Sequence, residues 1–305
     1  MGTLQKVVVT GAFGYIGRYI ASLLVSQGRQ VLNLTGHPHR PNPFGDRVDT
    51  ARLRFDDPPA LARELQGASV LFNTYWVRFP RGETTFDSAV EDSRLLIRAA
   101  SQAGVHRIVH ISITNPSTDS PLPYFKGKAI VEQAIIESGI SYSILRPTVV
   151  FGGEDILINN IAWLLRRAPL FGVPGKGDYR LQPVFVEDLA EMAVRAGESE
   201  KNEILDAVGP EIYTFEDLVV LIRRTVRSRA KIVHLHPRTM LFFARLIGFL
   251  VGDVVLTQDE IKGLMADLLV SADPPTGHTS LGEWLAANAG TVGRRYASEL
   301  ARHYR

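Results

Sequence analysis

The chain has 305 residues, 45% of them hydrophobic and 22% charged, with 26 glycines and 17 prolines. These values are ordinary for a globular protein and exclude a collagen-like rod, a coiled coil and a largely disordered chain. The 34 basic and 32 acidic side chains leave a net charge of +2, too little to indicate nucleic-acid binding. The absence of cysteine excludes disulfides, thiolate nucleophiles and iron–sulfur clusters.

No targeting or membrane-spanning segment is predicted. The apolar run at 7–9 is too short for the core of a signal peptide. The most apolar stretch, 241–256, contains Arg245 and Asp253 and is shorter than the ~20 residues that a membrane span needs. We expect a buried or interfacial helix there, and a soluble cytoplasmic protein.

Strand-like and helical patterns alternate through residues 1–150. Strands are predicted at 6–10, 30–35, 53–55, 70–74, 106–113 and 141–145. Helices are predicted between them at 16–27, 60–65, 86–103 and 126–138. This alternation predicts an α/β fold with a doubly wound, parallel, Rossmann-type sheet that carries helices on both faces.

The alternation ends after Phe151. Helices are predicted at 156–167, 187–196, 215–226, 239–252, 258–270, 281–288 and 294–303, with strands at 182–186 and 204–208 and a loop at 171–178. We therefore predict a dinucleotide-binding domain made of residues 1–150 and about 183–210. Residues of about 151–182 and 211–305 are predicted to form a smaller, mainly helical cap that closes over one edge of the sheet.

A glycine-rich turn joins the first predicted strand to the first predicted helix. Gly11 permits the tight turn, Gly14 lets the backbone approach a pyrophosphate, and Gly17 lets the helix pack close to the strand. The helix N-terminus offers free amides and a positive dipole end to phosphates. A purely structural turn is the alternative. Because the glycine-rich turn joins the first strand to the first helix, we favour a dinucleotide site. This site is formed by Gly11, Ala12, Phe13, Gly14, Tyr15, Ile16 and Gly17.

The segment after the second strand indicates which dinucleotide would bind. NAD-binding proteins usually place a carboxylate here for the ribose 2′-hydroxyl. The segment 35–40 instead contains His37, His39 and Arg40, which suit a 2′-phosphate and favour NADP over NAD. The alternative is a solvated loop. Asp56 is predicted to accept a hydrogen bond from adenine, and Asp57 beside it is a candidate helix cap.

A tyrosine and a lysine lie four residues apart at the start of the fourth predicted helix. Tyr124 and Lys128 share one helix face, so an ammonium near the phenol would lower the pKa of Tyr124 for general acid–base catalysis. Lys128 can also hold the nicotinamide ribose. Ser112, at the end of the fifth strand, is the candidate partner for a substrate oxygen, and Thr114 competes for that role.

Together these residues resemble the short-chain dehydrogenase/reductase superfamily, in its extended and atypical branch of NAD-dependent epimerase/dehydratase proteins. The motifs that carry the resemblance are TGAFGYIG at 10–17, Ser112, the Tyr124/Lys128 pair, LRPTVVFG at 145–152 and QPVFVEDLA at 182–190. The segment 153–190 is similar to that of the NADPH-binding accessory subunits of respiratory complex I. The resemblance covers about residues 5–210 and implies further cofactor contacts from Asn73, Thr74, Lys128 and Pro147.

Two departures from the family pattern bear on catalysis. Bulky Tyr75 and Trp76 follow the fourth strand, where extended members usually carry small residues. The helix segment 89–93 has no asparagine where a proton-relay asparagine often lies. The relatives in complex I bind NADPH without known turnover.

Two functions follow. One is an oxidoreductase or epimerase/dehydratase in which Tyr124 and Lys128 assist hydride exchange with the nicotinamide. The other is an NADP(H)-binding protein without turnover that acts as a structural or redox-sensing partner. An open cleft beside Tyr124 would favour the enzyme, and a cleft filled by Trp76 or Tyr75 would favour the binder.

An enzyme of this class would act on a small molecule such as a nucleotide sugar, a quinone or another carbonyl compound. The candidate substrate contacts are Arg78, Trp76, Thr148, Asn159, Asn160, Arg180 and Gln182. For each of them the alternative is a purely structural role in local hydrogen bonding or packing. No metal site is predicted, because His37 and His39 lack a third ligand. The arginines at 166–167 and 223–229 are predicted to lie on solvated helix faces. A homo-oligomer is compatible with the sequence.

Overall fold

The structure, a computed structural model, describes residues 6–303. The chain folds into two compact units. Unit 1 comprises Met1–Pro147 and Val186–Ala207, and unit 2 comprises Thr148–Phe185 and Val208–Arg305. The sequence had placed the corresponding boundaries near 150, 183 and 210.

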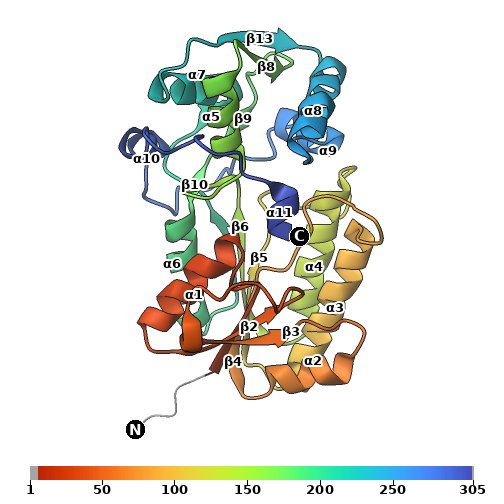
Figure 1. The fold of residues 1–305 in the computed structure, drawn as a ribbon. Helices are drawn as coiled ribbons and strands as arrows, with labels where there is room; N and C mark the ends of the chain where they lie inside the picture. The colour runs from red at the N-terminus through yellow and green to blue at the C-terminus, as the bar shows by residue number, and fades with distance from the viewer. Residues whose placement is uncertain (1–5, 304–305) are drawn as a thin grey trace. The chain divides into compact units, whose positions relative to one another are not determined.

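Unit 1 is built on a seven-stranded parallel sheet (Figure 1). Its strands, in order across the sheet, are β11 (Glu203–Ala207), β6 (Ser141–Pro147), β5 (Arg107–Ile111), β4 (Ala68–Asn73), β1 (Lys6–Thr10), β2 (Gln30–Thr35) and β3 (Val48–Arg52). The strand order reverses between β1 and β4, and open α/β sheets bind ligands at the carboxyl ends of strands beside such a reversal. The predicted Rossmann-type fold is therefore confirmed.

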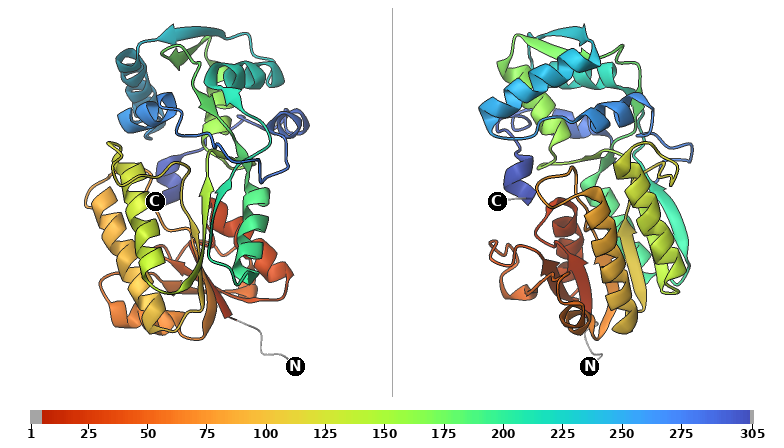
Figure 2. Two further views of the ribbon diagram at one scale, coloured as in Figure 1. Left: turned by 180° about the vertical axis from the view of Figure 1, so that it is seen from behind. Right: turned by 90° about the vertical axis from the view of Figure 1, so that its right-hand side faces the viewer.

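Helices cover both faces of this sheet (Figure 2). α1 (Tyr15–Ser26) and α6 (Val186–Glu198) pack together on one face. The other face carries α2 (Pro58–Leu65), α3 (Phe86–Gln102) and α4 (Pro123–Glu137), and a 3₁₀ helix, η1 (Gly45–Arg47), precedes β3. Apolar side chains of the second face form one cluster that includes Val8, Leu71, Ile108, Leu61, Leu96 and Ile135.

Burial on both faces explains why the central strands are apolar runs. The outermost strand is mostly exposed and lacks such a run, so the sequence pattern does not identify it. All five residues of β5 are buried. In the outermost strand, β3, only Val48 is fully buried. The strand predicted at 53–55 is wrong, because pairing with β2 rather than an apolar run makes Val48–Arg52 the strand.

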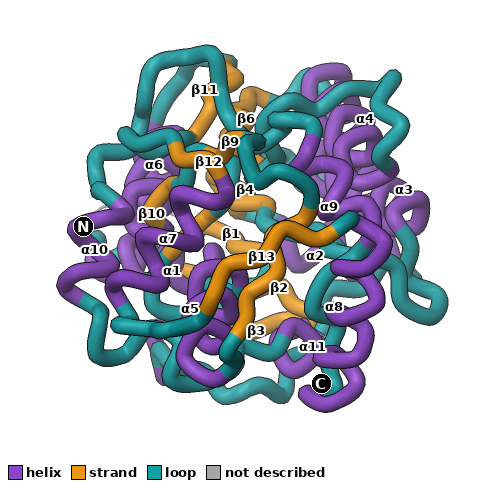
Figure 3. The backbone as a smooth tube through the Cα atoms, turned by 90° about the horizontal axis from the view of Figure 1, so that it is seen from above, coloured by secondary structure: helices purple, strands orange, loops and turns teal. Residues whose placement is uncertain are grey.

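Unit 2 consists of six helices and three two-stranded sheets within the described residues (Figure 3). Its helices are α5 (Leu157–Arg167), α7 (Phe215–Thr225), α8 (Pro237–Val251), α9 (Gln258–Met265), α10 (Leu281–Ala287) and α11 (Glu299–His303). The strand pairs are β7 (Val150–Phe151) with β10 (Val184–Phe185), β9 (Arg180–Leu181) with β12 (Tyr213–Thr214), and β8 (Leu170–Pro174) with β13 (Lys231–Leu235). One apolar cluster, which includes Phe151, Ile161, Leu218 and Leu285, forms its core.

Two predicted elements of unit 2 are wrong. The loop predicted at 171–178 contains strand β8, whose Gly172 lies so close to Leu235 of β13 that a Cβ there would come within 2.8 Å of the leucine side chain. The helix predicted at 294–303 begins only at Glu299, where the Asp253 carboxylate accepts hydrogen bonds from two backbone amides at 2.7 and 3.0 Å. Both elements depend on partners distant in sequence.

Helix α8 is largely exposed, so the prediction of a buried helix is wrong here, whereas the alternative of an interfacial helix stays a prediction. Its buried residues are Ala244 and Gly248, whereas Phe249 is 85% and Leu250 75% exposed. Among the residues from 6 to 303, no helix has the length and hydropathy needed to cross a membrane.

Candidate cofactor-binding site

The glycine-rich turn lies between β1 and α1, at the carboxyl end of a central strand. Gly11 has a φ of +66°, a conformation that favours glycine, and its amide donates to Leu34 O at 2.9 Å. A Cβ on Gly17 would lie 2.2 Å from Gly11 O, and one on Gly14 would lie 3.1 Å from the same atom. The turn and helix α1 therefore approach so closely that position 17 accepts no side chain.

Helix α1 presents an uncapped N-terminus at this turn. Gly14 is the N-cap residue, no side chain caps the helix, and its first turn contains no acidic residue. The Ala12 amide donates to the Asn33 side-chain oxygen at 2.8 Å, which ties the turn to β2. Free amides and the positive end of a helix dipole bind phosphate groups, so these residues fit the pyrophosphate of a dinucleotide.

The loop after β2 folds back beside the glycine-rich turn. The centroids of the Phe44 and Phe13 rings lie 6.2 Å apart. The His37 amide donates to Thr35 Oγ1 at 3.1 Å, and the Arg40 amide donates to His37 O at 3.2 Å. Arg40 is half-buried, and this burial lowers the pKa of its guanidinium. Residues 36–40 of this loop thus contain a half-buried cation and no carboxylate.

Of the two aspartates after β3, Asp57 is the helix cap. Its carboxylate accepts a hydrogen bond from Ala60 N at 3.0 Å at the start of α2. Asp56 is exposed, and its contact with adenine stays a prediction.

Side-chain hydrogen bonds fasten the loop after β4 to the end of β1. Thr74 Oγ1 donates to Thr10 O at 2.5 Å, and Thr74 N donates to Thr10 Oγ1 at 2.7 Å. Thr10 Oγ1 lies 3.3 Å from Asn73 Oδ1, which also accepts from Tyr75 N at 3.1 Å. Asn73 and Thr74 thus lie at the reversal of strand order, where their predicted cofactor role would place them.

Ser112 and Thr114 are both engaged within the protein. Ser112 Oγ donates to Glu132, whose two carboxylate oxygens accept from Arg146 Nε at 3.0 Å and from a terminal Arg146 nitrogen at 2.6 Å. Thr114 donates to Pro147 O from its amide at 3.0 Å and from its hydroxyl at 2.9 Å. Sequence reasoning missed Glu132; its spacing of four residues from Lys128 on the same helix was the available signal.

Lys128 is almost completely buried, with 2% exposure. Its Nζ donates to Ile111 O at 2.7 Å and lies 4.8 Å from the centroid of the Trp76 ring. Burial lowers its pKa to about 7, and the nearby Glu132 carboxylate partly opposes this effect. The Lys128 side chain thus loses its proton far more readily than an ordinary lysine, which weakens its suitability as a permanent positive charge beside Tyr124.

Trp76 packs against the same face of α4 as Lys128. Its ring meets Tyr124 edge-on at 5.9 Å and stacks near Phe86 at 6.4 Å. A Cβ on Gly127 would lie 2.8 Å from the Trp76 ring. The indole therefore covers the helix surface between Tyr124 and Lys128, and its own N–H is buried with no hydrogen-bond partner among the described residues.

Tyr75 is held by α3. Its hydroxyl donates to Asp92 Oδ2 at 2.7 Å, and its ring lies 5.1 Å from Phe55. Burial raises the pKa of the Asp92 carboxyl. Asp92 belongs to the helix segment in which the sequence lacked a relay asparagine, and it serves here as the partner of Tyr75.

The predicted substrate contacts in unit 2 make hydrogen bonds within that unit. Thr148 Oγ1 donates to Gln182 O, and Gln182 Nε2 donates to Gly209 O at 2.8 Å. Asn159 Nδ2 donates to Asp155 Oδ2 at 2.9 Å, whereas Asn160 exchanges two hydrogen bonds with Ala297 at 2.8 and 3.0 Å.

The other two predicted contacts are more accessible. Arg180 pairs with Asp267 at 3.5 Å and is 54% exposed. Arg78, in unit 1, lies over the Phe79 ring at 5.9 Å. A substrate role for any of these side chains stays a prediction.

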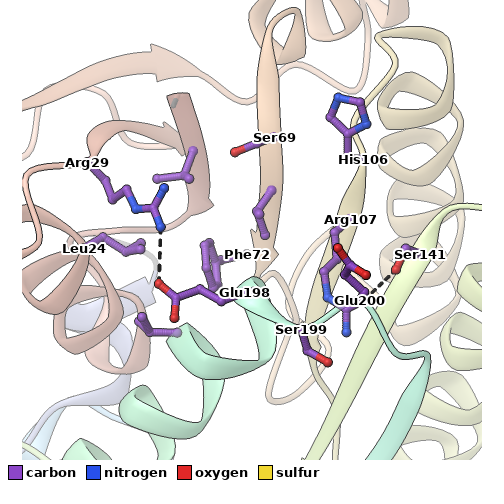
Figure 4. Close-up of a pocket in the computed structure, with 14 residues that line it drawn as sticks. Leu24, Arg29, Ser69, Phe72, His106, Arg107, Ser141, Glu198, Ser199 and Glu200 are labelled. Atoms are coloured by element: carbon purple, nitrogen blue, oxygen red, sulfur yellow. Dashed lines mark hydrogen bonds and ion pairs between the residues drawn. The ribbon is translucent and has the colours of Figure 1, made fainter. Parts of the chain in front are cut away.

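A separate pocket of ≈ 650 Å³ lies at the amino ends of the strands of unit 1 (Figure 4). Arg29 and Glu198 form an ion pair across 3.2 Å there. Arg107 donates to Ala196 O and Lys201 O, both at 2.7 Å, and to Ser141. Because these groups already satisfy one another, the pocket offers no comparable ligand site.

The sheet topology and the glycine-rich turn define an α/β protein of the Rossmann type with the features of a dinucleotide site. The sequence profile of the NmrA-like family matches residues 3–239. This match spans more than half of the chain, and the protein belongs to the NmrA-like family.

The chain is similar to several subunits of mitochondrial NADH dehydrogenase. It is 25% identical to NADH dehydrogenase (ubiquinone) 1 alpha subcomplex subunit 9, mitochondrial, from Arabidopsis thaliana, over 86% of this chain and 70% of that protein. It is 22% identical to the mitochondrial NADH-ubiquinone oxidoreductase 40 kDa subunit of Neurospora crassa, over 88% and 72%. These relatives contradict the expectation of a cytoplasmic protein, because both are mitochondrial.

Solved structures of epimerases and reductases share the fold. A nucleoside-diphosphate-sugar epimerase from Staphylococcus aureus has a TM-score of 0.74 at 17% identity, covering 92% of this chain and 99% of that one. The triphenylmethane reductase of Citrobacter sp., complexed with NADP(H), has a TM-score of 0.70 at 18% identity, with 93% and 99% covered.

Proposed function

We propose that this protein binds a nicotinamide dinucleotide, with NADPH preferred, and uses it as a structural or redox-sensing element without turnover. The glycine-rich turn supplies the pyrophosphate site, and Arg40 with His37 supplies the contacts to a 2′-phosphate. A dinucleotide bound here would bring hydride chemistry, but Lys128 and Ser112, which should assist it, are hydrogen-bonded to other groups.

One observation carries the proposal: Trp76 covers the buried Lys128 and packs edge-on against Tyr124. Lys128 Nζ is directed to Ile111 O and lies under the indole, and the Tyr124 ring packs edge-on against the same indole. A phenol that acts as a general acid or base must reach the reacting oxygen of a substrate. Here the helix surface beside it is occupied by an aromatic side chain.

Ser112 adds independent support. Its hydroxyl donates to a carboxylate that Arg146 binds through two nitrogens, so using it to bind a substrate oxygen would break a buried network. The relatives named as NADH dehydrogenase subunits favour a multi-subunit protein assembly as the partner.

The first prediction is binding without turnover. NADPH should bind, as measured by fluorescence titration, whereas its oxidation in the presence of quinones, nucleotide sugars and small carbonyl compounds should stay at the rate without protein. Tyr124→Phe, which removes only the hydroxyl, should leave NADPH affinity within about twofold, because the phenol does not serve the cofactor.

The same variant identifies an enzyme if the proposal is wrong. A general acid or base contributes about 10²–10⁴-fold to rate. Substrate-dependent NADPH oxidation by the unaltered protein, reduced at least about a hundredfold in Tyr124→Phe, would establish the oxidoreductase alternative.

The second prediction concerns the choice of cofactor. Arg40→Ala should weaken NADPH binding about tenfold, equivalent to about 1.4 kcal/mol, and should leave NADH binding unchanged. Arg98→Ala is the matched control, because Arg98 is an exposed arginine of α3. Equal losses for both cofactors would show that Arg40 does not contact a 2′-phosphate.

A further inference from the structure

Unit 2 contains a second pocket, of ≈ 710 Å³, lined by two segments that are distant in sequence. One segment, 165–170, joins α5 to β8, and the other, 226–231, joins α7 to β13. Both joins can be followed in Figure 1. The site is formed within unit 2 and does not involve the glycine-rich turn.

The lining of this pocket is strongly basic. Five of its twelve lining residues are cationic and none is acidic, the cations being Arg166, Arg167, Arg227, Arg229 and Lys231. No ion pair joins any of these five to a carboxylate among the described residues. Burial, followed by the positive charges of Arg294 and Arg167, lowers the pKa of Arg166. In a chain of net charge +2, this is a local excess of positive charge.

Arg227 occupies a backbone conformation that normally selects glycine. It has a φ of +53° just after the end of α7, and its amide donates to Arg224 O while the Ser228 amide donates to Arg223 O. Helix ends of this geometry usually carry glycine or asparagine. The other non-glycine residues with positive φ among those described are Asn115 and Asp267, whose side chains tolerate it. An arginine here places a guanidinium at the pocket against local backbone preference, a pattern that occurs at functional sites.

The walls of the pocket are fixed to each other. Lys231 N donates to Pro169 O at 2.9 Å, and Ser228 Oγ donates to Leu165 O. Strands β8 and β13 then pair in register, with Lys231 opposite Leu170. The backbone segments that carry the cations are therefore held next to each other, which keeps the five positive charges around one pocket.

Two of the four arginines also have a structural role. Arg166 donates to Val292 O at 2.9 Å and to Ala289 O at 2.6 Å, and Arg167 donates to Gly293 O at 3.2 Å. These bonds attach α5 to the segment before α11. They do not account for Arg227, Arg229 and Lys231, whose side chains make no hydrogen bond or ion pair among the described residues.

We propose that this pocket is a binding site for a phosphate-bearing anion, with Arg227, Arg229 and Lys231 as its principal ligands and Arg166 and Arg167 as flanking charges. Planar guanidinium groups bind phosphate oxygens through paired hydrogen bonds, and several cations around one pocket attract a multiply charged anion. A soluble phosphate ester and the phosphate headgroup of a lipid share this chemistry.

Calorimetric titration of the full chain with inorganic pyrophosphate tests the site, with saturating NADPH present to occupy the glycine-rich turn. The decisive variant is Arg227→Gly with Arg229→Ala, because glycine at 227 relieves the backbone and keeps the helix end intact. We expect pyrophosphate affinity at the pocket to fall at least tenfold, with an unchanged or higher melting temperature and unchanged NADPH affinity. A loss of pyrophosphate affinity without a loss of thermal stability indicates a ligand site, because removing residues with a structural role would lower the melting temperature.

Arg98→Ala is the matched control, since it removes one exposed positive charge from unit 1 and should bind pyrophosphate like the unaltered protein. The proposal is overturned if the double variant binds pyrophosphate as tightly as the unaltered chain, or if Arg98→Ala loses as much affinity. Cosedimentation with phosphatidic acid vesicles, against phosphatidylcholine vesicles, distinguishes the sources of phosphate. Vesicle binding lost in the double variant identifies a lipid headgroup, and pyrophosphate binding alone identifies a soluble ester.

Discussion

At the scale of residues, the sequence position of Lys128 predicts one role and its surroundings in the fold give it another. Its position four residues after Tyr124 predicts a catalytic pair, and the structure places it on the same helix. However, its 2% exposure and its hydrogen bond to Ile111 O make it part of a buried polar group with His110 and Glu132. An ammonium buried in this way is costly unless it is paired or deprotonated.

The third prediction concerns the pH dependence of stability and follows from the pKa of Lys128. Its folded-state pKa, about 7, lies below its ordinary value of 10.5, so between these pH values the unfolded chain binds the proton that the folded chain lacks. The free energy of unfolding therefore rises with pH in this window. From pH 7 to pH 9 we expect the free energy of unfolding of Lys128→Met to rise by about 2 kcal/mol less than that of the unaltered protein. Urea denaturation at both pH values measures the difference, and parallel curves for the two proteins would refute the assigned pKa.

At the scale of elements, the β1–turn–α1 unit combines a local signal with a close approach. The spacing of the three glycines predicts the turn from the sequence alone. The structure adds the reason for the last of them, because the helix backbone at position 17 lies against Gly11 O.

The corresponding prediction is that Gly17→Ala displaces α1. Its Cβ would lie 2.2 Å from Gly11 O, which forces the helix to move away from the turn. We expect a loss of about 1–3 kcal/mol in unfolding free energy and at least about tenfold weaker NADPH binding. Gly290→Ala is the control, since a Cβ there meets no atom within 4 Å and its φ is not positive. Normal NADPH affinity in a folded Gly17→Ala protein would place the dinucleotide elsewhere.

Elements on the periphery could not be found in the same way. β3 is mostly exposed, and β8 contains Gly172 and Pro174, so neither forms the apolar run that identifies a central strand. Their identity comes from pairing with β2 and β13, which lie elsewhere in the sequence. A pattern confined to a short window carries no information about such partners.

At the scale of the whole molecule, the chain passes between its two units at 147–148, 185–186 and 207–208. Each unit has its own apolar core, so each phosphate-related site proposed above is built from residues of a single unit. The glycine-rich turn belongs to unit 1 and the basic pocket to unit 2. The variants of one site therefore serve as controls for the other.

The sequence by itself determined the Rossmann-type architecture, the glycine-rich turn and the absence of a carboxylate at 35–40. These features depend on periodicity and on residues that are close along the chain, where backbone geometry acts directly. Only the tertiary structure decided that Ser112 pairs with Glu132, that Trp76 covers Lys128, and that Arg227 joins a pocket with Arg166. Each of these contacts joins side chains from different elements, and their meeting depends on how the helices and strands pack.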